Sequence, residues 1–335
     1  MAQEPRTSLP RAPAGDSRRS EMSPPARPLS SYASITAALW AAASATSVPS
    51  VKIAGGVDMP MLAFGTAKTS LANCSVQDAV EQWLRLGGRH IDTADDYGTQ
   101  PDVGRALKAA GVPREEIFIT TKVPGPIGKD AVSAKILNTA LPQLGVEYID
   151  LVLIHFPCKG MDQKDSPGCL PSAVDDRRET WAGLAELRAA GKIRAIGVSN
   201  YDDEQVMEIV SAFQEPPAVN QVEFHLAYHN ETLLQEMRGV GTTLEAWASL
   251  GGPTVHGRHP TISLGDSRVK SVAERYNAST AQIALRWETQ KGVVPVTATC
   301  SEAHALGDMD AFKFELSEAD MTLLDELMPA TTVVV

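Results

Sequence analysis

Four ionisable side chains are spaced as proton-transfer chemistry would require. Asp92, Lys122 and His155 each end a short apolar run, and Tyr97 follows Asp92 by five residues. A phenol, whose pKa is about 10, is a poor acid at neutral pH, but a nearby ammonium stabilises the phenolate and lowers that pKa. Asp92 would keep Lys122 charged, and a neutral His155 would orient a substrate oxygen by donating a hydrogen bond. These four residues are therefore the predicted catalytic group.

Each side chain taken singly also has a structural interpretation. Asp92 could cap the following helix, Tyr97 could be a core aromatic residue with its hydroxyl at the rim, and Lys122 could extend to solvent. His155 could be a histidine satisfied at the rim. Ionisable residues at the ends of three successive strands are costly to bury unless they compensate one another. Their joint occurrence therefore favours an active site.

The elements that must position these residues alternate from about residue 50 onward. The predicted strands are Met61–Phe64, His90–Asp92, Ile117–Lys122, Ile149–His155, Ala195–Ser199, Ala218–Glu223, Thr243–Trp247 and Val293–Val296. The predicted helices are Ser75–Leu86, Pro101–Ala110, Asp130–Leu144, Ser172–Ala190, Asp202–Phe213, Asn230–Arg238, Ser267–Tyr276, Ser279–Gln290 and Ser317–Leu327. The last of these helices has a capping-box start.

Eight strands with intervening helices predict a fold of the α/β class, a (β/α)8 TIM barrel. Val51–Met59, with two central glycines, predicts a short N-terminal β-hairpin before the barrel. In such barrels the chemistry lies at the C-terminal ends of the strands, where the four candidate residues fall. An open doubly wound sheet would need a glycine-rich turn, and no GxGxxG motif follows any predicted strand.

Composition limits the classes of partner. The chain has 335 residues, 43% of them apolar, and a net charge of −11. Residues 1–50 carry five arginines against three acids, so the remaining chain carries −13. An acidic body with scattered charges argues against nucleic-acid and membrane partners, although an anionic cofactor needs only a local positive site. We expect a monomer that acts on a small-molecule substrate.

Residues 1–50 differ from the rest, because 28 of them are Ala, Ser or Pro. This leader cannot bury enough apolar surface to become ordered, so we predict disorder over 1–50 and a barrel over 51–335. Its arginines and serines resemble an organellar transit peptide, and Ile35–Ala45 resembles a signal-peptide core. Its acidic residues speak against a transit peptide, so a plain tail and a misassigned start site stay open.

The number and spacing of the cysteines indicate the redox state of the compartment in which the protein resides. Cys74, Cys158, Cys169 and Cys300 form no CxxC pair, which predicts free thiols in a reducing compartment. We therefore expect a cytoplasmic protein, or an organellar or secretory one if the leader is a targeting signal.

Five motifs occur in order at barrel spacing. They are Asp92-Thr93-Ala94-x-x-Tyr97, Thr121-Lys122-Val123, Asp150-Leu151 through His155-Phe156-Pro157, Gly197-Val198-Ser199-Asn200 and Asn220-Gln221-Val222-Glu223. Over about residues 51–328 the chain resembles the aldo-keto reductase family. The resemblance implies an NAD(P)H-dependent oxidoreductase that reduces aldehydes or ketones to alcohols, with Tyr97 as the general acid.

The resemblance also implies a cofactor site. Ser199, Asn200 and Gln221 match positions that hydrogen-bond the nicotinamide carboxamide. Trp247 stands in Ala246-Trp247-Ala248-Ser249-Leu250, where the family stacks an aromatic ring on the nicotinamide.

The adenosine end departs from the family pattern. Where NADPH-binding members carry Pro-Lys-Ser followed by Arg and Asn, this chain has Pro295-Val296-Thr297 and then His304 and Asp308. Two cations for the 2′-phosphate are thus missing, and Asp308 adds a negative charge, while the Thr297 hydroxyl remains. NADP(H) is the cofactor that the resemblance implies. Val296 and His304 make NAD(H) a second candidate.

Two other functional classes share part of this pattern. A non-catalytic barrel of the same ancestry could bind nicotinamide cofactor as a redox sensor or accessory subunit, but all four catalytic positions are retained. A metal-dependent hydrolase would need clustered ligands at strand ends, where only Asp92 and His155 qualify, so we predict no metal.

Overall fold

The barrel is built from the predicted strands. The computed structural model describes residues 48–71, 73–158, 174–251 and 264–328, so nearly all of the predicted leader lies outside the described residues. The eight strands are β3 (Ala63–Gly65), β4 (His90–Asp92), β5 (Phe118–Val123), β6 (Ile149–Ile154), β7 (Ile193–Ser199), β8 (Val219–Glu223), β9 (Thr243–Trp247) and β10 (Val294–Thr297). They pair in parallel in the order β10-β3-β4-β5-β6-β7-β8-β9 and close a barrel, which confirms the predicted (β/α)8 fold.

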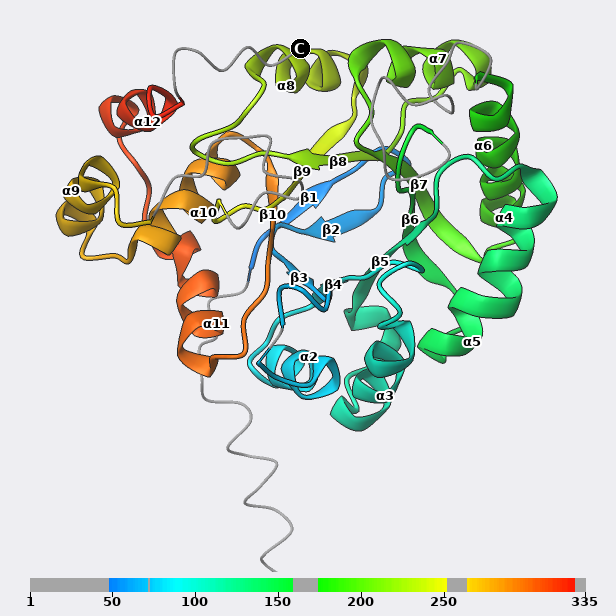
Figure 1. Ribbon diagram of the computed structural model, residues 1–335, viewed down its shortest axis with the longest axis horizontal. Helices are drawn as coiled ribbons and strands as arrows, with labels where there is room; N and C mark the ends of the chain where they lie inside the picture. The colour runs from blue at the N-terminus through cyan, green and yellow to red at the C-terminus, as the bar shows by residue number, and fades with distance from the viewer. Residues whose placement is uncertain (1–47, 72, 159–173, 252–263, 329–335) are drawn as a thin grey trace, which may run out of the picture. The chain divides into compact units, whose positions relative to one another are not determined.

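Helices surround the strands (Figure 1). They are α2 (Val76–Arg85), α3 (Gln100–Ala110), α4 (Lys129–Lys135), α5 (Leu141–Leu144), α6 (Val174–Ala189), α7 (Asp203–Phe213), α8 (Glu231–Val240), α9 (Ser267–Tyr276), α10 (Thr280–Gln290), α11 (Glu302–Met309) and α12 (Glu318–Asp325). A π-helical turn, Ile136–Ala140, joins α4 to α5 just before Pro142, which has no N–H for a helical hydrogen bond. Helix α11 was not among the predicted helices; it has only eight residues, with Gly307 in its last turn.

The predicted hairpin is also present. Strands β1 (Ser50–Lys52) and β2 (Asp58–Pro60) are antiparallel, with Val51 opposite Met59. Apolar residues of the hairpin segment, including Met59, pack in one cluster with inward-facing strand residues such as Leu151 and Leu153. The hairpin thereby contributes to the interior core of the barrel.

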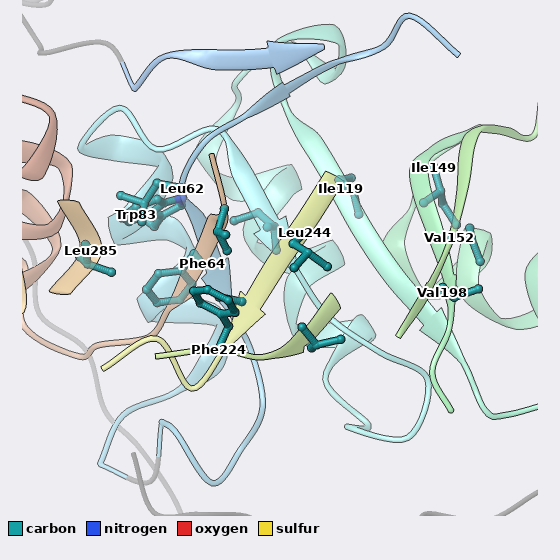
Figure 2. Close-up of a cluster of buried hydrophobic side chains, with 14 of the residues drawn as sticks. Leu62, Phe64, Trp83, Ile119, Ile149, Val152, Val198, Phe224, Leu244 and Leu285 are labelled. Carbon is teal, nitrogen blue, oxygen red and sulfur yellow. The ribbon is translucent and has the colours of Figure 1, made fainter. Parts of the chain in front are cut away.

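A second, larger core lies between the strands and the helices. Val152 and Ile154 belong to it, whereas their neighbours Leu151 and Leu153 face the interior, as the period of two in a strand requires. Figure 2 shows part of this core, in which the Phe64 ring lies 5.3 Å from that of Trp83 between their centroids. Two dry layers of side chains therefore hold the strand ends in place.

The prediction of free thiols is wrong. Cys74, directly before α2, forms a disulfide with Cys300 in the loop after β10, with 5.8 Å between the Cα atoms. Cys158 is disulfide-bonded too, and no cysteine in the described part of the chain is free. A sequence separation of 226 conceals the first bond. It forms because barrel closure places β10 beside β3, which brings the loops after these strands together. The cysteines therefore do not indicate a reducing compartment.

Within the described ranges, no helix has both the length and the apolar character needed to span a bilayer.

Candidate active site

The predicted catalytic residues meet at the C-terminal end of the barrel. Asp92 is the last residue of β4, Lys122 lies near the end of β5, and His155 directly follows β6. These three side chains are buried, and Tyr97 reaches them half-buried from the loop between β4 and α3. Adjacent strands of the barrel thus supply three of the four residues.

Lys122 is the centre of this group. Its Nζ donates to Asp92 Oδ1 at 2.7 Å and Oδ2 at 2.8 Å, and to the Thr93 carbonyl oxygen at 3.1 Å. The Tyr97 hydroxyl lies 3.4 Å from the same nitrogen. Burial alone would lower the pKa of Lys122, but the charges of Asp92, Tyr97 and Glu245 and the hydrogen bond to Asp92 together outweigh burial and raise that pKa. The expected ion pair is present, and the lysine stays an ammonium.

The expected effect on Tyr97 is only partly right. Burial raises the pKa of the phenol, and the ammonium of Lys122 opposes that rise without overcoming it. The loss of water around the Tyr97 ring, which the residue pattern does not reveal, decides the direction. Tyr97 is therefore protonated at neutral pH and holds a proton that it can donate.

His155 has a partner that the sequence analysis missed. Its Nδ1 lies 3.1 Å from Oδ2 of Asp96, the residue directly before Tyr97. Burial lowers the pKa of His155 below its ordinary value, and Asp96 opposes that fall without overcoming it. The imidazole also meets the edge of the Tyr97 ring, with 5.7 Å between centroids. In the sequence, this contact is indicated by two further acids, Asp95 and Asp96, between Asp92 and Tyr97.

All four residues predicted at the nicotinamide adjoin this group through hydrogen bonds. Asn200, just after β7, donates from Nδ2 to the His155 carbonyl oxygen at 2.9 Å. Its Oδ1 accepts from Nε1 of Trp247, at the end of β9, at 3.0 Å. Ser199 Oγ donates to the Gln221 carbonyl oxygen at 2.8 Å. Asn200 adopts a left-handed φ of 62°, which asparagine tolerates better than most residues.

Gln221 connects the cofactor residues to the catalytic pair. Its Nε2 donates to Asp92 Oδ2 at 2.9 Å and to Glu245 Oε2 at 2.8 Å. The side-chain carbonyl oxygen of Gln221 has no partner among the residues the structure describes, which leaves an acceptor for an amide N–H. Glu245 is fully buried, and burial raises its pKa to about 8. Glu245 was not among the predicted site residues, although an acid inside an apolar strand is a signal in the sequence.

The residues predicted at the adenosine end do not form one charged site. Thr297 Oγ1 donates to Asp308 Oδ2 at 2.8 Å, and Asp308 is buried. Burial raises the pKa of Asp308 to about 6, and the bond from Thr297 opposes that rise. His304 is exposed on α11, one turn before Asp308. The structure therefore pairs Asp308 with Thr297 and leaves His304 at the surface.

One other group of side chains has the composition of a metal site. His229, Glu231 and Asp325 bring ligand atoms within 4.8 Å of one another. Lys291 Nζ lies between the two carboxylates, 2.6 Å from Glu231 Oε1 and 2.9 Å from Asp325 Oδ1. An ammonium therefore already compensates these acids.

Comparison with known proteins covers the whole barrel. A model of the Aldo/keto reductase family matches residues 61–329. Glyoxal reductase of Bacillus subtilis (strain 168) is 35% identical over 277 residues, 83% of this chain and 92% of that protein. Morphine 6-dehydrogenase of Pseudomonas putida is 31% identical over 287 residues, 83% of this chain and 91% of that protein. The crystal structure of a Bombyx mori aldo-keto reductase in complex with NADP matches with a TM-score of 0.75 at 29% identity, covering 84% of this chain and 93% of that one.

Proposed function

The chain belongs to the aldo/keto reductase family, and on that premise we propose that it is an NAD(P)H-dependent oxidoreductase that reduces aldehydes or ketones to alcohols. One observation carries the proposal. A buried, charge-compensated lysine lies 3.4 Å from the hydroxyl of a protonated tyrosine at the end of the barrel where the strands terminate. That pair is suited to supply a proton and to stabilise the anion that remains.

The residues at the ends of β7 to β9 suit the nicotinamide. Gln221 keeps an acceptor oxygen, and Ser199 and Asn200 place a hydroxyl and an amide beside it. The Trp247 ring, held by its bond to Asn200, offers a flat apolar surface for stacking. When bound there, the reduced nicotinamide supplies the hydride that the carbonyl carbon accepts.

The chain's own residues would handle the proton. Tyr97 donates its hydroxyl proton to the oxygen that becomes an alkoxide, a far stronger base than a phenolate. Lys122 stabilises the phenolate left behind, and Asp92 keeps that ammonium in place. His155 orients the carbonyl oxygen next to the Tyr97 hydroxyl. Carbon thus gains a hydride, oxygen gains a proton, and Tyr97 recovers its proton from solvent.

The choice of cofactor follows from the adenosine end. NADP is bound by the Bombyx mori relative, which makes NADP(H) the first candidate here. Because Val296 and His304 stand where the family pattern has cations, we propose a weak preference for NADP(H) or dual use of NAD(H).

The test is turnover of reduced nicotinamide with a panel of aldehydes and ketones. We expect the phenylalanine variant Tyr97→Phe to lose about 10²- to 10⁴-fold in kcat, the range of a lost general acid. Tyr148→Phe is the matched control, because the Tyr148 ring packs under Arg114 away from the catalytic group.

Full activity of Tyr97→Phe would remove that residue from its role. Cofactor binding without turnover on any carbonyl would favour the non-catalytic barrel instead.

A further inference from the structure

Glu245 is a buried acid for which the proposed reaction has no role. It lies in β9 opposite Gln221 of β8 and Val294 of β10, and Val294 belongs to the interior core. Its Oε2 accepts from Gln221 Nε2 at 2.8 Å, and the same nitrogen donates to Asp92 Oδ2 at 2.9 Å. Its Oε1 has no hydrogen-bond partner among the described residues. A fully buried carboxylate with an unsatisfied oxygen is costly, so these contacts favour the protonated acid.

The histidine beside Glu245 supplies no positive charge. His90 Nε2 lies 3.7 Å from Glu245 Oε1, beyond hydrogen-bond distance. Nδ1 of the same ring lies 3.0 Å from the Pro60 carbonyl oxygen, which can only accept, so Nδ1 carries the hydrogen. Nε2 then accepts from the Thr120 hydroxyl at 2.9 Å. Burial lowers the pKa of His90 to about 4, so the ring is neutral at neutral pH.

The barrel interior holds more acids than cations. Among the described residues the buried cations are Lys122 and Arg177, and Arg177 belongs to the outer helix α6. Lys122 is paired with Asp92 and lies 3.4 Å from the hydroxyl of Tyr97. With Glu245, three acidic groups therefore share one ammonium.

This count of charges links Glu245 to proton donation. With Asp92 ionised, the group is neutral only while Glu245 and Tyr97 both keep their protons. Donation by Tyr97 leaves one negative charge in excess, next to the ammonium of Lys122. If Glu245 were already ionised, donation would leave two, and charges in a buried site interact strongly. Ionisation of Glu245 therefore opposes formation of the phenolate.

We propose that Glu245 is a positioning residue that keeps its proton during carbonyl reduction, and that loss of this proton at alkaline pH prevents Tyr97 from donating its own. The inference rests on the proposed function, and it adds a pH limit to that reaction.

The groups around Glu245 set the pH at which it titrates. Burial and the negative charge of Asp92 on β4 raise the pKa of Glu245 to about 8, against the opposing effects of Gln221 on β8 and Lys122 on β5. The neighbours from β10 and the histidine of β4 are uncharged, as described above. Glu245 is therefore protonated at neutral pH, and at pH 9 about a tenth of the molecules keep this proton.

The other candidate catalytic residues hold their protonation state between pH 7 and pH 9. Burial keeps the pKa of His155 below its ordinary value, so this ring is neutral throughout. The pKa of Tyr97 and that of Lys122 are both raised. A loss of activity in this range is therefore expected from Glu245.

The experiment compares Glu245→Gln with Glu288→Gln. Glutamine at position 245 keeps an oxygen that can accept from Gln221, but it cannot ionise. Glu288 of α10 is the matched control, because it is a second fully buried acid whose pKa burial raises.

The first readout is the single-turnover rate of carbonyl reduction as a function of pH. In the parent protein we expect this rate to be about tenfold lower at pH 9 than at pH 7. In Glu245→Gln the fall should be less than about twofold, and Glu288→Gln should keep the parent profile. Removal of a buried acid that is merely structural would change stability without moving the profile.

The second readout is the infrared spectrum, in which a protonated carboxyl group and a carboxylate have separate bands. We expect the parent protein to lose a protonated-carboxyl band between pH 7 and pH 9. This band should be absent from Glu245→Gln and present in Glu288→Gln.

A parent rate that is constant from pH 7 to pH 9 would overturn the inference, and this result needs no variant. An unchanged alkaline fall in Glu245→Gln, or an ionised Glu245 at pH 7, would contradict it equally. Because the infrared spectrum needs no turnover, it reports the proton on Glu245 even if the protein reduces none of the carbonyls. Failure of the proposed function is then seen separately.

Discussion

The two sides of the barrel mouth balance their charges in different ways. On the side formed by the ends of β4 to β6, the proposed catalytic side, the buried carboxylate of Asp92 meets a buried ammonium at 2.7 Å. On the side formed by the end of β10 and by α11, where we propose that the adenosine binds, the buried carboxylate of Asp308 meets the hydroxyl of Thr297 at 2.8 Å. The first carboxylate belongs to an ion pair, whereas burial raises the pKa of the second to about 6.

This difference indicates how strictly each side is specified. The buried ammonium of Lys122 must lie close to the phenol of Tyr97 to stabilise its anion. Removing either Lys122 or Asp92 leaves a buried charge uncompensated. The end of a cofactor that takes no part in the reaction needs only binding energy, which different residues can supply. Changes on the catalytic side should therefore affect kcat, and changes on the adenosine side should affect cofactor affinity.

The largest effect is expected from Lys122→Met. Loss of the ammonium leaves Asp92 buried without a cation, which costs about 3–5 kcal/mol of unfolding free energy. It also removes the charge that stabilises the Tyr97 phenolate, so kcat should fall by about 10²-fold or more. Urea unfolding and steady-state kinetics measure the two effects.

Lys135→Met is its control, because the pair of Lys135 with Asp95 is partly exposed and such pairs contribute about 0–1 kcal/mol. Equal losses of stability in the two variants would contradict the contrast between a buried and a surface pair.

The next effect concerns the disulfide on the adenosine side. Replacing Cys74 and Cys300 together by serine opens a covalent loop of 226 residues, which should cost about 2–5 kcal/mol of unfolding free energy. The bond joins the start of α2 to the loop before α11, so we expect a higher KM for the cofactor and an unchanged kcat at saturation.

The single variants Cys74→Ser and Cys300→Ser provide the parallel measurement, because a thiol reductant would also reduce the disulfide of Cys158 beside His155. A fall in kcat at an unchanged cofactor KM would show that the bond between Cys74 and Cys300 supports the catalytic side instead.

The sequence predicted that the candidate catalytic residues lie together because its signals are local. Asp92, Lys122 and His155 mark three strand ends, and the period of the strands and the rule for barrel chemistry place them together. Asp96 was missed because only the fold shows which of two adjacent acids turns toward the histidine ring.

Features that depend on closure of the barrel were not predictable. The bond between Cys74 and Cys300 exists because the first and last barrel strands are neighbours. The burial of Asp308 against Thr297 likewise required the position of α11, a short helix with a weak signal. The expectation that Asp308 would present its charge to a phosphate followed from its residue type alone.

The smallest effect is a change of cofactor preference. The double variant Val296→Lys, His304→Arg places cations at the two positions where the family pattern has them. A hydrogen bond to a charged group contributes about 1.5–3 kcal/mol, less when exposed to solvent, so we expect the ratio of kcat/KM for NADPH to that for NADH to rise about tenfold. The gain should appear as a lower KM for NADPH and should shrink at high ionic strength.

Arg85, which pairs with Glu302 on α11 at 2.7 Å, offers the counter-test. The parent protein could already prefer NADPH strongly, with Arg85→Met abolishing that preference. In that case Arg85 of α2 replaces the two cations that are missing at positions 296 and 304. The adenosine side would then be as strictly specified as the catalytic side.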